Sequence, residues 1–219
     1  MLPGTKWPIW ASFYVLLAYI VGPNFGCEEE TLPTSVRDLC KCHNSTSLHC
    51  SGLRTTQALR AAGMHNATRH FQSILELRID NSIFKCFEPE DFSGFVSLQA
   101  LSVAFSGLQS FLCQQHHQHK RLFLRDLETL DLANNKLSKL KREHYQHLPK
   151  LRELNVSHND ISRIAPNFFL EMQLSVLDLS YNKLNEHIKS SVLYKMPTTR
   201  LKYLDISRKP KIREIFCLL

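Results

Sequence analysis

The sequence has little glycine, with seven residues among 219. It contains no glycine-rich loop that could cradle a phosphate, and it lacks the G-x-S-x-G nucleophile elbow and the H-E-x-x-H zinc motif. Acidic, basic and nucleophilic side chains occur, but no catalytic arrangement of them is recognisable. We therefore predict that the chain is not an enzyme and that it needs no cofactor.

Long hydrophobic runs are also scarce. One occupies residues 7–22 (WPIWASFYVLLAYIVG), and Lys6 is the only charged residue before Glu28. This run is short for a membrane span and typical of an export signal, so residues 1–26 are predicted to be a signal peptide. An uncleaved signal anchor is the alternative. No second run is long enough to span a membrane, so we expect a secreted chain with no membrane insertion after cleavage.

A repeated pattern accounts for most of the sequence. The stretches LETLDLANNKL (127–137), LRELNVSHNDI (151–161) and LSVLDLSYNKL (174–184) share the pattern L-x-x-L-x-L-x-x-N-x-L. Weaker copies begin at Ile74, Leu98 and Leu201, and the starts recur at intervals of 23–29 residues. A period of this length predicts a solenoid in which each repeat stacks on the next.

Each repeat can be interpreted physically. The L-x-L pair predicts a short parallel strand whose two leucines point inward and whose middle residue points out. The chain then turns sharply and buries backbone groups, which are costly when they lack partners. Asparagine carries one acceptor and two donors on a short side chain. We therefore predict an asparagine ladder of Asn135, Asn159 and Asn182, with Ser82 and Ser106 doing the same less fully.

The pattern resembles the typical leucine-rich repeat of animal extracellular proteins, a family that includes small leucine-rich proteoglycans, Toll-like receptor ectodomains and Slit-type or Nogo-receptor-type modules. The resemblance covers roughly residues 40–219. It implies an α/β-type repeat solenoid, a leucine-rich repeat horseshoe with short parallel strands on its concave face and an irregular or helical convex side. We expect a cysteine-rich cap over 27–73, then a solenoid over 74–219 of about six repeats, with the last incomplete and no C-terminal cap.

The seven cysteines suit an oxidising compartment. Resemblance to the family's N-terminal cap implies the pairs Cys27–Cys42 and Cys40–Cys50; a zinc site at CKCH (40–43) is the alternative, with a poor match to zinc-ligand spacing. Cys86 and Cys113 lie in adjacent repeats whose loops should stack, which makes a third bridge plausible. These three pairs leave Cys217 without an assigned disulfide partner. Either Cys217 or the uncapped last coil could join two chains into an oligomer.

Side chains that point outward from the strands form the surface best suited to binding, because they are contiguous and rigidly spaced. The alternative is an ordinary solvated sheet face. In the C-terminal half this surface combines acidic residues with aromatic ones, which are favoured at binding hot spots. The candidate ligand-binding residues are Asp131, His158, Asp178, Tyr181, Tyr203 and Asp205.

Other motifs are weaker. Sequons predict N-glycosylation at Asn44, Asn66 and Asn155, and the last lies within the candidate binding surface. The string CQQHHQHKR (113–121) could hold a metal through its histidines, but adjacent ligands on a loop insertion seldom make a specific site, so we predict no metal. The net charge of +7 includes a basic flank that could meet sulfated glycans or simply aid solubility. Nucleic acid is not expected as a partner.

These observations favour a secreted, non-enzymatic recognition protein that binds a protein or glycan ligand on the sheet face, and the resemblance extends this to innate recognition or cell-surface signalling. One alternative is a matrix protein that holds collagen or glycosaminoglycan. Another is that the chain is the N-terminal fragment of a leucine-rich repeat membrane receptor.

Overall fold

The computed structural model describes residues 27, 32, 34–57, 59–60, 69–113, 124–166, 168–169, 172–185 and 200–207. The predicted signal peptide, Asn66, the histidine string and Cys217 lie outside the described residues.

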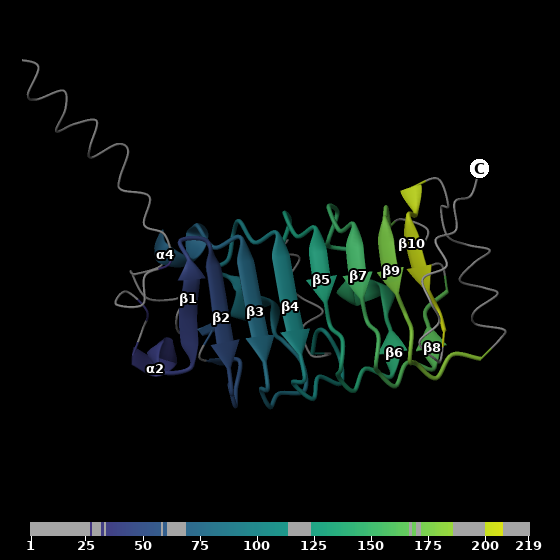
Figure 1. Ribbon diagram of the computed structural model, residues 1–219, viewed down its shortest axis with the longest axis horizontal. Helices are drawn as coiled ribbons and strands as arrows, with labels where there is room; N and C mark the ends of the chain where they lie inside the picture. The colour runs from purple at the N-terminus through teal and green to yellow at the C-terminus, as the bar shows by residue number, and fades with distance from the viewer. Residues whose placement is uncertain are drawn as a thin grey trace, which may run out of the picture.

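One eight-stranded sheet runs the length of the molecule, in the order β1-β2-β3-β4-β5-β7-β9-β10 (Figure 1). All its neighbouring strands are parallel except β1 and β2, which are antiparallel. Consecutive repeats thus place their strands side by side, and the solenoid and horseshoe fold class predicted from the repeats is confirmed. The strands are β1 Cys40–Asn44, β2 Ser47–Ser51, β3 Glu76–Asp80, β4 Ala100–Ala104, β5 Thr129–Asp131, β7 Glu153–Asn155, β9 Val176–Asp178 and β10 Tyr203–Asp205.

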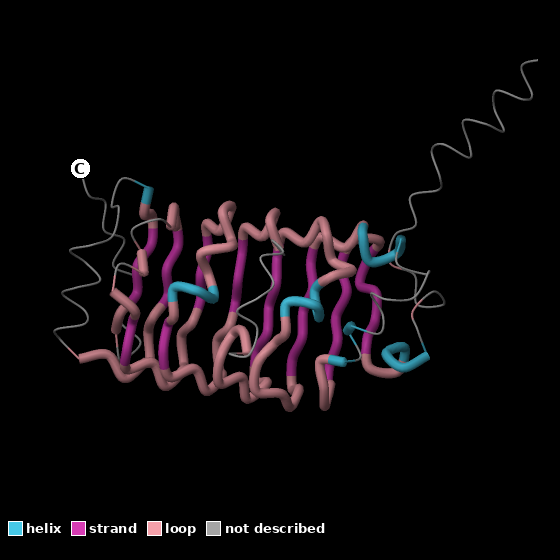
Figure 2. Tube along the Cα trace, turned by 180° about the vertical axis from the view of Figure 1, so that it is seen from behind, coloured by secondary structure: helices cyan, strands magenta, loops and turns pink. Residues whose placement is uncertain are grey.

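A second layer of loops and short helical turns lies behind this sheet (Figure 2). It includes the 3₁₀ turns η2 (Pro89–Phe92) and η3 (Arg142–His144), and a two-stranded sheet of β6 (Lys139–Leu140) and β8 (Arg163–Ile164). Two short helices, α2 (Thr34–Arg37) and α4 (Arg69–Gln72), lie near the N-terminal end of the sheet.

The core lies between the two layers. Inward strand residues align from repeat to repeat; Leu101, for example, pairs with Leu77 on one side and Leu130 on the other. These leucines are at most 1% exposed. Aromatic rings fill the other half of the core, with Tyr145 stacked at 5.6 Å from Phe111 and edge-on at 5.1 Å from Phe168. Such pairs add to the stabilisation that burial alone provides.

The asparagines join neighbouring coils. Asn135 Nδ2 donates to the carbonyl of Val103 in the preceding repeat (2.6 Å), and its Oδ1 accepts the amides of Ser106 and Leu108 (both 3.1 Å). Asn159 and Asn182 bond in the same way to the repeat before each of them. Each asparagine is buried, so its bonds satisfy backbone groups that water does not reach.

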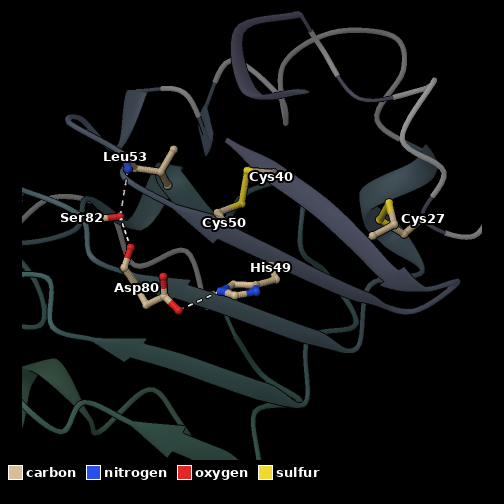
Figure 3. The surroundings of a disulfide bond; sticks show 8 residues. Cys27, Cys40, His49, Cys50, Leu53, Asp80 and Ser82 are labelled. Atoms are coloured by element: carbon tan, nitrogen blue, oxygen red, sulfur yellow. Dashed lines mark hydrogen bonds and ion pairs between the residues drawn. A yellow bond between two sulfur atoms is a disulfide. The ribbon is translucent and has the colours of Figure 1, made fainter. Parts of the chain in front are cut away.

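Serine satisfies fewer groups in the earlier copies of this position. Ser82 Oγ accepts the Leu53 amide (3.0 Å) and donates to the Asp80 carbonyl (2.9 Å) (Figure 3). Ser106 Oγ donates to the Ala104 carbonyl (2.9 Å). A hydroxyl has one donor where the amide has two, which accounts for the smaller number of bonds.

The N-terminal cap is continuous with the main sheet. Strand β2 pairs in parallel with β3, so that Leu48 and Cys50 occupy the inward positions of Leu77 and Ile79. Disulfides link Cys27 to Cys42 and Cys40 to Cys50, and the second of these is visible beside His49 in Figure 3. Both cysteines of the CKCH string are therefore engaged in disulfides, and the alternative of a zinc site there is wrong because no thiolate remains to bind a metal.

A third disulfide joins Cys86 to Cys113, with the two Cα atoms 5.1 Å apart. The two loops lie against each other, since the Cys113 amide donates to the Phe87 carbonyl (2.9 Å) and the Phe87 amide donates to the Phe111 carbonyl (3.1 Å). The bridge ties the repeat that begins at Ile74 to the repeat that begins at Leu98.

Candidate functional site: the sheet face

The outward side chains of the eight-stranded sheet, together with the residues that directly follow its strands, form a continuous surface that we call the sheet face. Its central column is set by the strand register, which aligns Asp131, Asn155, Asp178 and Asp205 on neighbouring strands. Neighbouring strands lie about 4.8 Å apart, so these four side chains form one row. The predicted ligand-binding aspartates are thus brought together.

These aspartates also have a structural task. Oδ1 of Asp178 accepts the amide of Ser180 (2.8 Å), and Asp131 and Asp205 bond in the same way to the amide two residues on. Asn155 makes this bond as well, with the Ser157 amide at 3.0 Å. The bond fixes the turn at the end of each strand, and an amide oxygen serves as well as a carboxylate. Part of the acidic row is therefore explained by the fold, and Oδ2 is the atom that remains for a partner.

A second column follows the ends of β3, β4, β5, β7 and β9, where the chain turns. Its members are Asn81, Phe105, Asn134, His158 and Tyr181, and all five have left-handed backbone angles with φ between 48° and 57°. At four of these positions, all except Asn81, the amide donates to the next coil, as the His158 amide does to the Ser180 carbonyl (3.0 Å). Asparagine tolerates the conformation, whereas bulky residues pay roughly 1–2 kcal/mol for it.

Aromatic side chains gather in this column. The rings of His158 and Tyr181 stack with centroids 4.0 Å apart and planes 12° from parallel. Phe105 is 61% exposed, although it is both apolar and in the left-handed conformation. Tyr203 lies in β10 in register with Val176, within the column that flanks the aspartate row on its other side. The predicted residues His158, Tyr181 and Tyr203 therefore lie on the same surface as the aspartates.

The N-terminal half of the sheet face carries a different cluster. His49 Nε2 lies 2.8 Å from Asp80 Oδ2, and Arg78 Nε lies 3.6 Å from the same oxygen (Figure 3 shows the His49–Asp80 pair). Burial alone would raise the pKa of the Asp80 carboxyl, but hydrogen bonds from His49 and Ser51 and the charges of His49 and Arg78 outweigh burial and lower it. Asp80 is thus held by two basic side chains at the N-terminal end of the sheet face, whereas the aspartate row lies in its C-terminal half.

Sequence reasoning missed two of these features. It did not select Phe105, whose exposure depends on the turn geometry, nor the His49–Asp80 pair. The pair could have been found by extending the repeat into the cap, because Leu48 and Cys50 are spaced like the L-x-L pair of a repeat and pair with Leu77 and Ile79.

The remaining candidate residues lie elsewhere or outside the described chain. Asn44 ends β1 and is exposed, whereas Asn155 is half-buried within the aspartate row. Within the described ranges, no three histidine, cysteine or acidic side chains come together as a metal site would require. In the same ranges, no helix is long and apolar enough to cross a membrane.

Comparison with known proteins agrees with this architecture. The family described as "Leucine rich repeat" matches residues 125–184. Human lumican (Homo sapiens) is 36% identical over 126 residues, which are 52% of this chain and 36% of lumican. Mouse Podocan-like protein 1 (Mus musculus) is 29% identical over 176 residues, which are 76% of this chain and 30% of that protein.

Among solved structures, the match to a TLR13–ssRNA13 complex covers 73% of this chain and 24% of that chain, with a TM-score of 0.46 and 22% identity. The chain spans less than half the length of these relatives. The repeats, the capping disulfides and the family match lead to one conclusion: the chain is a secreted, extracellular leucine-rich repeat protein with an N-terminal cysteine cap.

Proposed function

We propose that this protein is a non-enzymatic recognition protein and that it binds a protein ligand on the C-terminal half of the sheet face. The partner would be another extracellular protein or the ectodomain of a cell-surface receptor, as in cell-surface signalling or innate recognition. The residues in contact would come from the aspartate row and the aromatic column, namely Asp131, His158, Asp178, Tyr181, Tyr203 and Asp205.

The observation that carries the proposal is the aromatic column beside the row of acids. Large side chains at His158 and Tyr181 occupy positions that asparagine fills with less strain at Asn81 and Asn134. Backbone strain of this kind often accompanies function. Tyrosine offers a large contact area at low entropic cost, and a row of carboxylates beside it would orient a partner by charge.

The test is a binding screen against an array of purified extracellular protein domains, followed by affinity measurements on two variants of this chain. The sheet-face variant combines Asp131→Asn with Tyr181→Asn, neither of which creates a glycosylation sequon. Asparagine at 131 keeps the turn bond, as Asn155 shows, and asparagine at 181 suits the left-handed backbone. This variant should fold and be secreted normally, yet lose at least tenfold in affinity, equivalent to about 1.4 kcal/mol.

The matched control changes Lys139, Lys141 and Arg142 to alanine. These residues belong to β6 and the adjoining turn η3, away from the sheet face. The control should keep its affinity within a factor of about two, since rim and remote charges contribute little to binding. Loss of binding in the control together with full binding by the sheet-face variant would overturn the assignment.

A second candidate function is that of a matrix protein that binds collagen or glycosaminoglycan. It is favoured by the similarity to lumican and by the basic flank, whose described members are Lys136, Lys139, Lys141, Arg142 and Lys150. Retention on a heparin column above physiological salt, and its loss in the flank variant, would favour this function. Elution at low salt would remove it, because weak surface electrostatics are screened by then.

A further inference from the structure

We propose that Asn44 carries an N-linked glycan and that this glycan shields the outer edge of β1, the first strand of the sheet. The proposal is independent of the ligand-binding surface, since Asn44 lies at the N-terminal end of the solenoid.

The turn around Asn44 presents the acceptor amide. Asn44 is exposed and ends β1, and Ser45 and Thr46 form the tight turn into β2. Oδ1 of Asn44 accepts both the Thr46 amide (2.8 Å) and the Thr46 hydroxyl (3.1 Å). The third residue of the sequon therefore holds the carbonyl side of the asparagine amide, and Nδ2 is the atom left for transfer.

The chemistry suits the compartment in which the chain matures. Three disulfides place it in the secretory route, where N-x-S/T sequons meet a lipid-diphosphate-linked oligosaccharide. A bond forms between Nδ2 and the anomeric carbon of the first sugar, and the bond from that carbon to the diphosphate oxygen breaks. The lipid diphosphate leaves with the electron pair, and the amide gives up one proton.

The position of Asn44 gives the glycan a structural consequence. Within the described part of the chain, β2 is the one strand that pairs with β1, and Cys27 contacts β1 through its disulfide to Cys42 and its amide bond to the Ser45 carbonyl (2.6 Å). An open edge with unpaired backbone groups invites pairing with another chain. A branched, hydrated oligosaccharide on the last residue of β1 occupies the space that an incoming strand would need.

Asn155 provides the contrast. It lies between Asp131 and Asp178 in the strand register, in the interior of the sheet. A glycan there would cover part of the sheet face and would leave the edge of β1 open. The two sequons can therefore be separated by their consequences.

The experiment compares Thr46→Ala with Ser157→Ala in protein secreted from animal cells. Each change removes one sequon while keeping its asparagine, uncharged and bonded to the backbone amide two residues on. Peptide mapping should find a glycan on Asn44 in the unchanged protein and none in Thr46→Ala. Size-exclusion chromatography with light scattering should show Thr46→Ala self-associating at concentrations where the unchanged protein and Ser157→Ala are monomeric or share the same smaller assembly.

Two results would overturn the proposal. An unmodified Asn44 peptide in the secreted protein would remove the site itself. If Asn44 is modified but Thr46→Ala associates no more than Ser157→Ala does, the glycan does not guard the edge of β1.

Discussion

Replacing two asparagines of the ladder by alanine should have unequal effects, although both side chains are buried and both occupy the same position of their repeats. Alanine at 159 removes an acceptor from one amide, that of Leu137. The carbonyls to which Asn159 donates keep other donors: Leu132 O has Asn135 Nδ2, Val156 O has Asn182 Nδ2, and Ser157 O has the Asn134 amide. One orphaned amide predicts a loss of about 1–3 kcal/mol in the free energy of unfolding.

Alanine at 135 leaves more groups without partners. Oδ1 of Asn135 serves two amides, those of Ser106 and Leu108, and Nδ2 is the donor to the carbonyls of Val103 and Ala133. Two orphaned amides and two carbonyls predict a loss of about 3–5 kcal/mol after partial relaxation. The Asn135→Ala variant should therefore be less stable than Asn159→Ala by about 2 kcal/mol.

Urea denaturation followed by circular dichroism measures both losses on secreted, oxidised protein. Equal losses, or a larger loss for Asn159→Ala, would refute the reasoning, because they would mean that the number of orphaned groups does not set the cost. Two unchanged midpoints would show that neither side chain satisfies buried backbone groups at all.

Three further predictions follow from single sites. Non-reducing peptide mapping should recover Cys40 joined to Cys50, and a free thiol at either position would contradict the cap. Burial lowers the pKa of His144 to about 4, and the nearby Lys141 charge acts in the same direction. As pH falls below the ordinary histidine pKa of 6.5, His144 is therefore protonated in the unfolded chain but stays neutral in the folded chain. The free energy of unfolding should therefore drop by about 2 kcal/mol from this residue between about pH 7.5 and 5. That part of the drop should disappear in His144→Gln, and an undiminished pH dependence would contradict it. Phe105→Asn should raise stability by about 0.5–1 kcal/mol, because asparagine suits the left-handed backbone; a lower melting temperature would contradict the strain argument.

The repeat pattern predicted the strands and the inward leucines because both depend on residues close together in the sequence. The two-residue period of a strand and the spacing of the coils can each be seen within one or two repeats. Asn135, Asn159 and Asn182 could be picked out for the same reason. The turn bond of Asp178 could not, because nothing in the sequence distinguishes a carboxylate that caps a turn from one that does not. The exposure of Phe105 and the pairing of His49 with Asp80 depend on which residues of different coils come to lie side by side, which single-repeat patterns do not specify.

Hydroxyl-radical footprinting of the complex is the most direct test of partner binding to the sheet face. Aromatic side chains are reactive probes, and Tyr145, buried in the core, provides an unreactive internal control. With the partner bound, oxidation of His158, Tyr181 and Tyr203 should fall while oxidation of the peptides around Lys139 and Arg142 stays unchanged. Protection of the peptides around Lys139 and Arg142, with His158, Tyr181 and Tyr203 oxidised as in the free protein, would contradict the account.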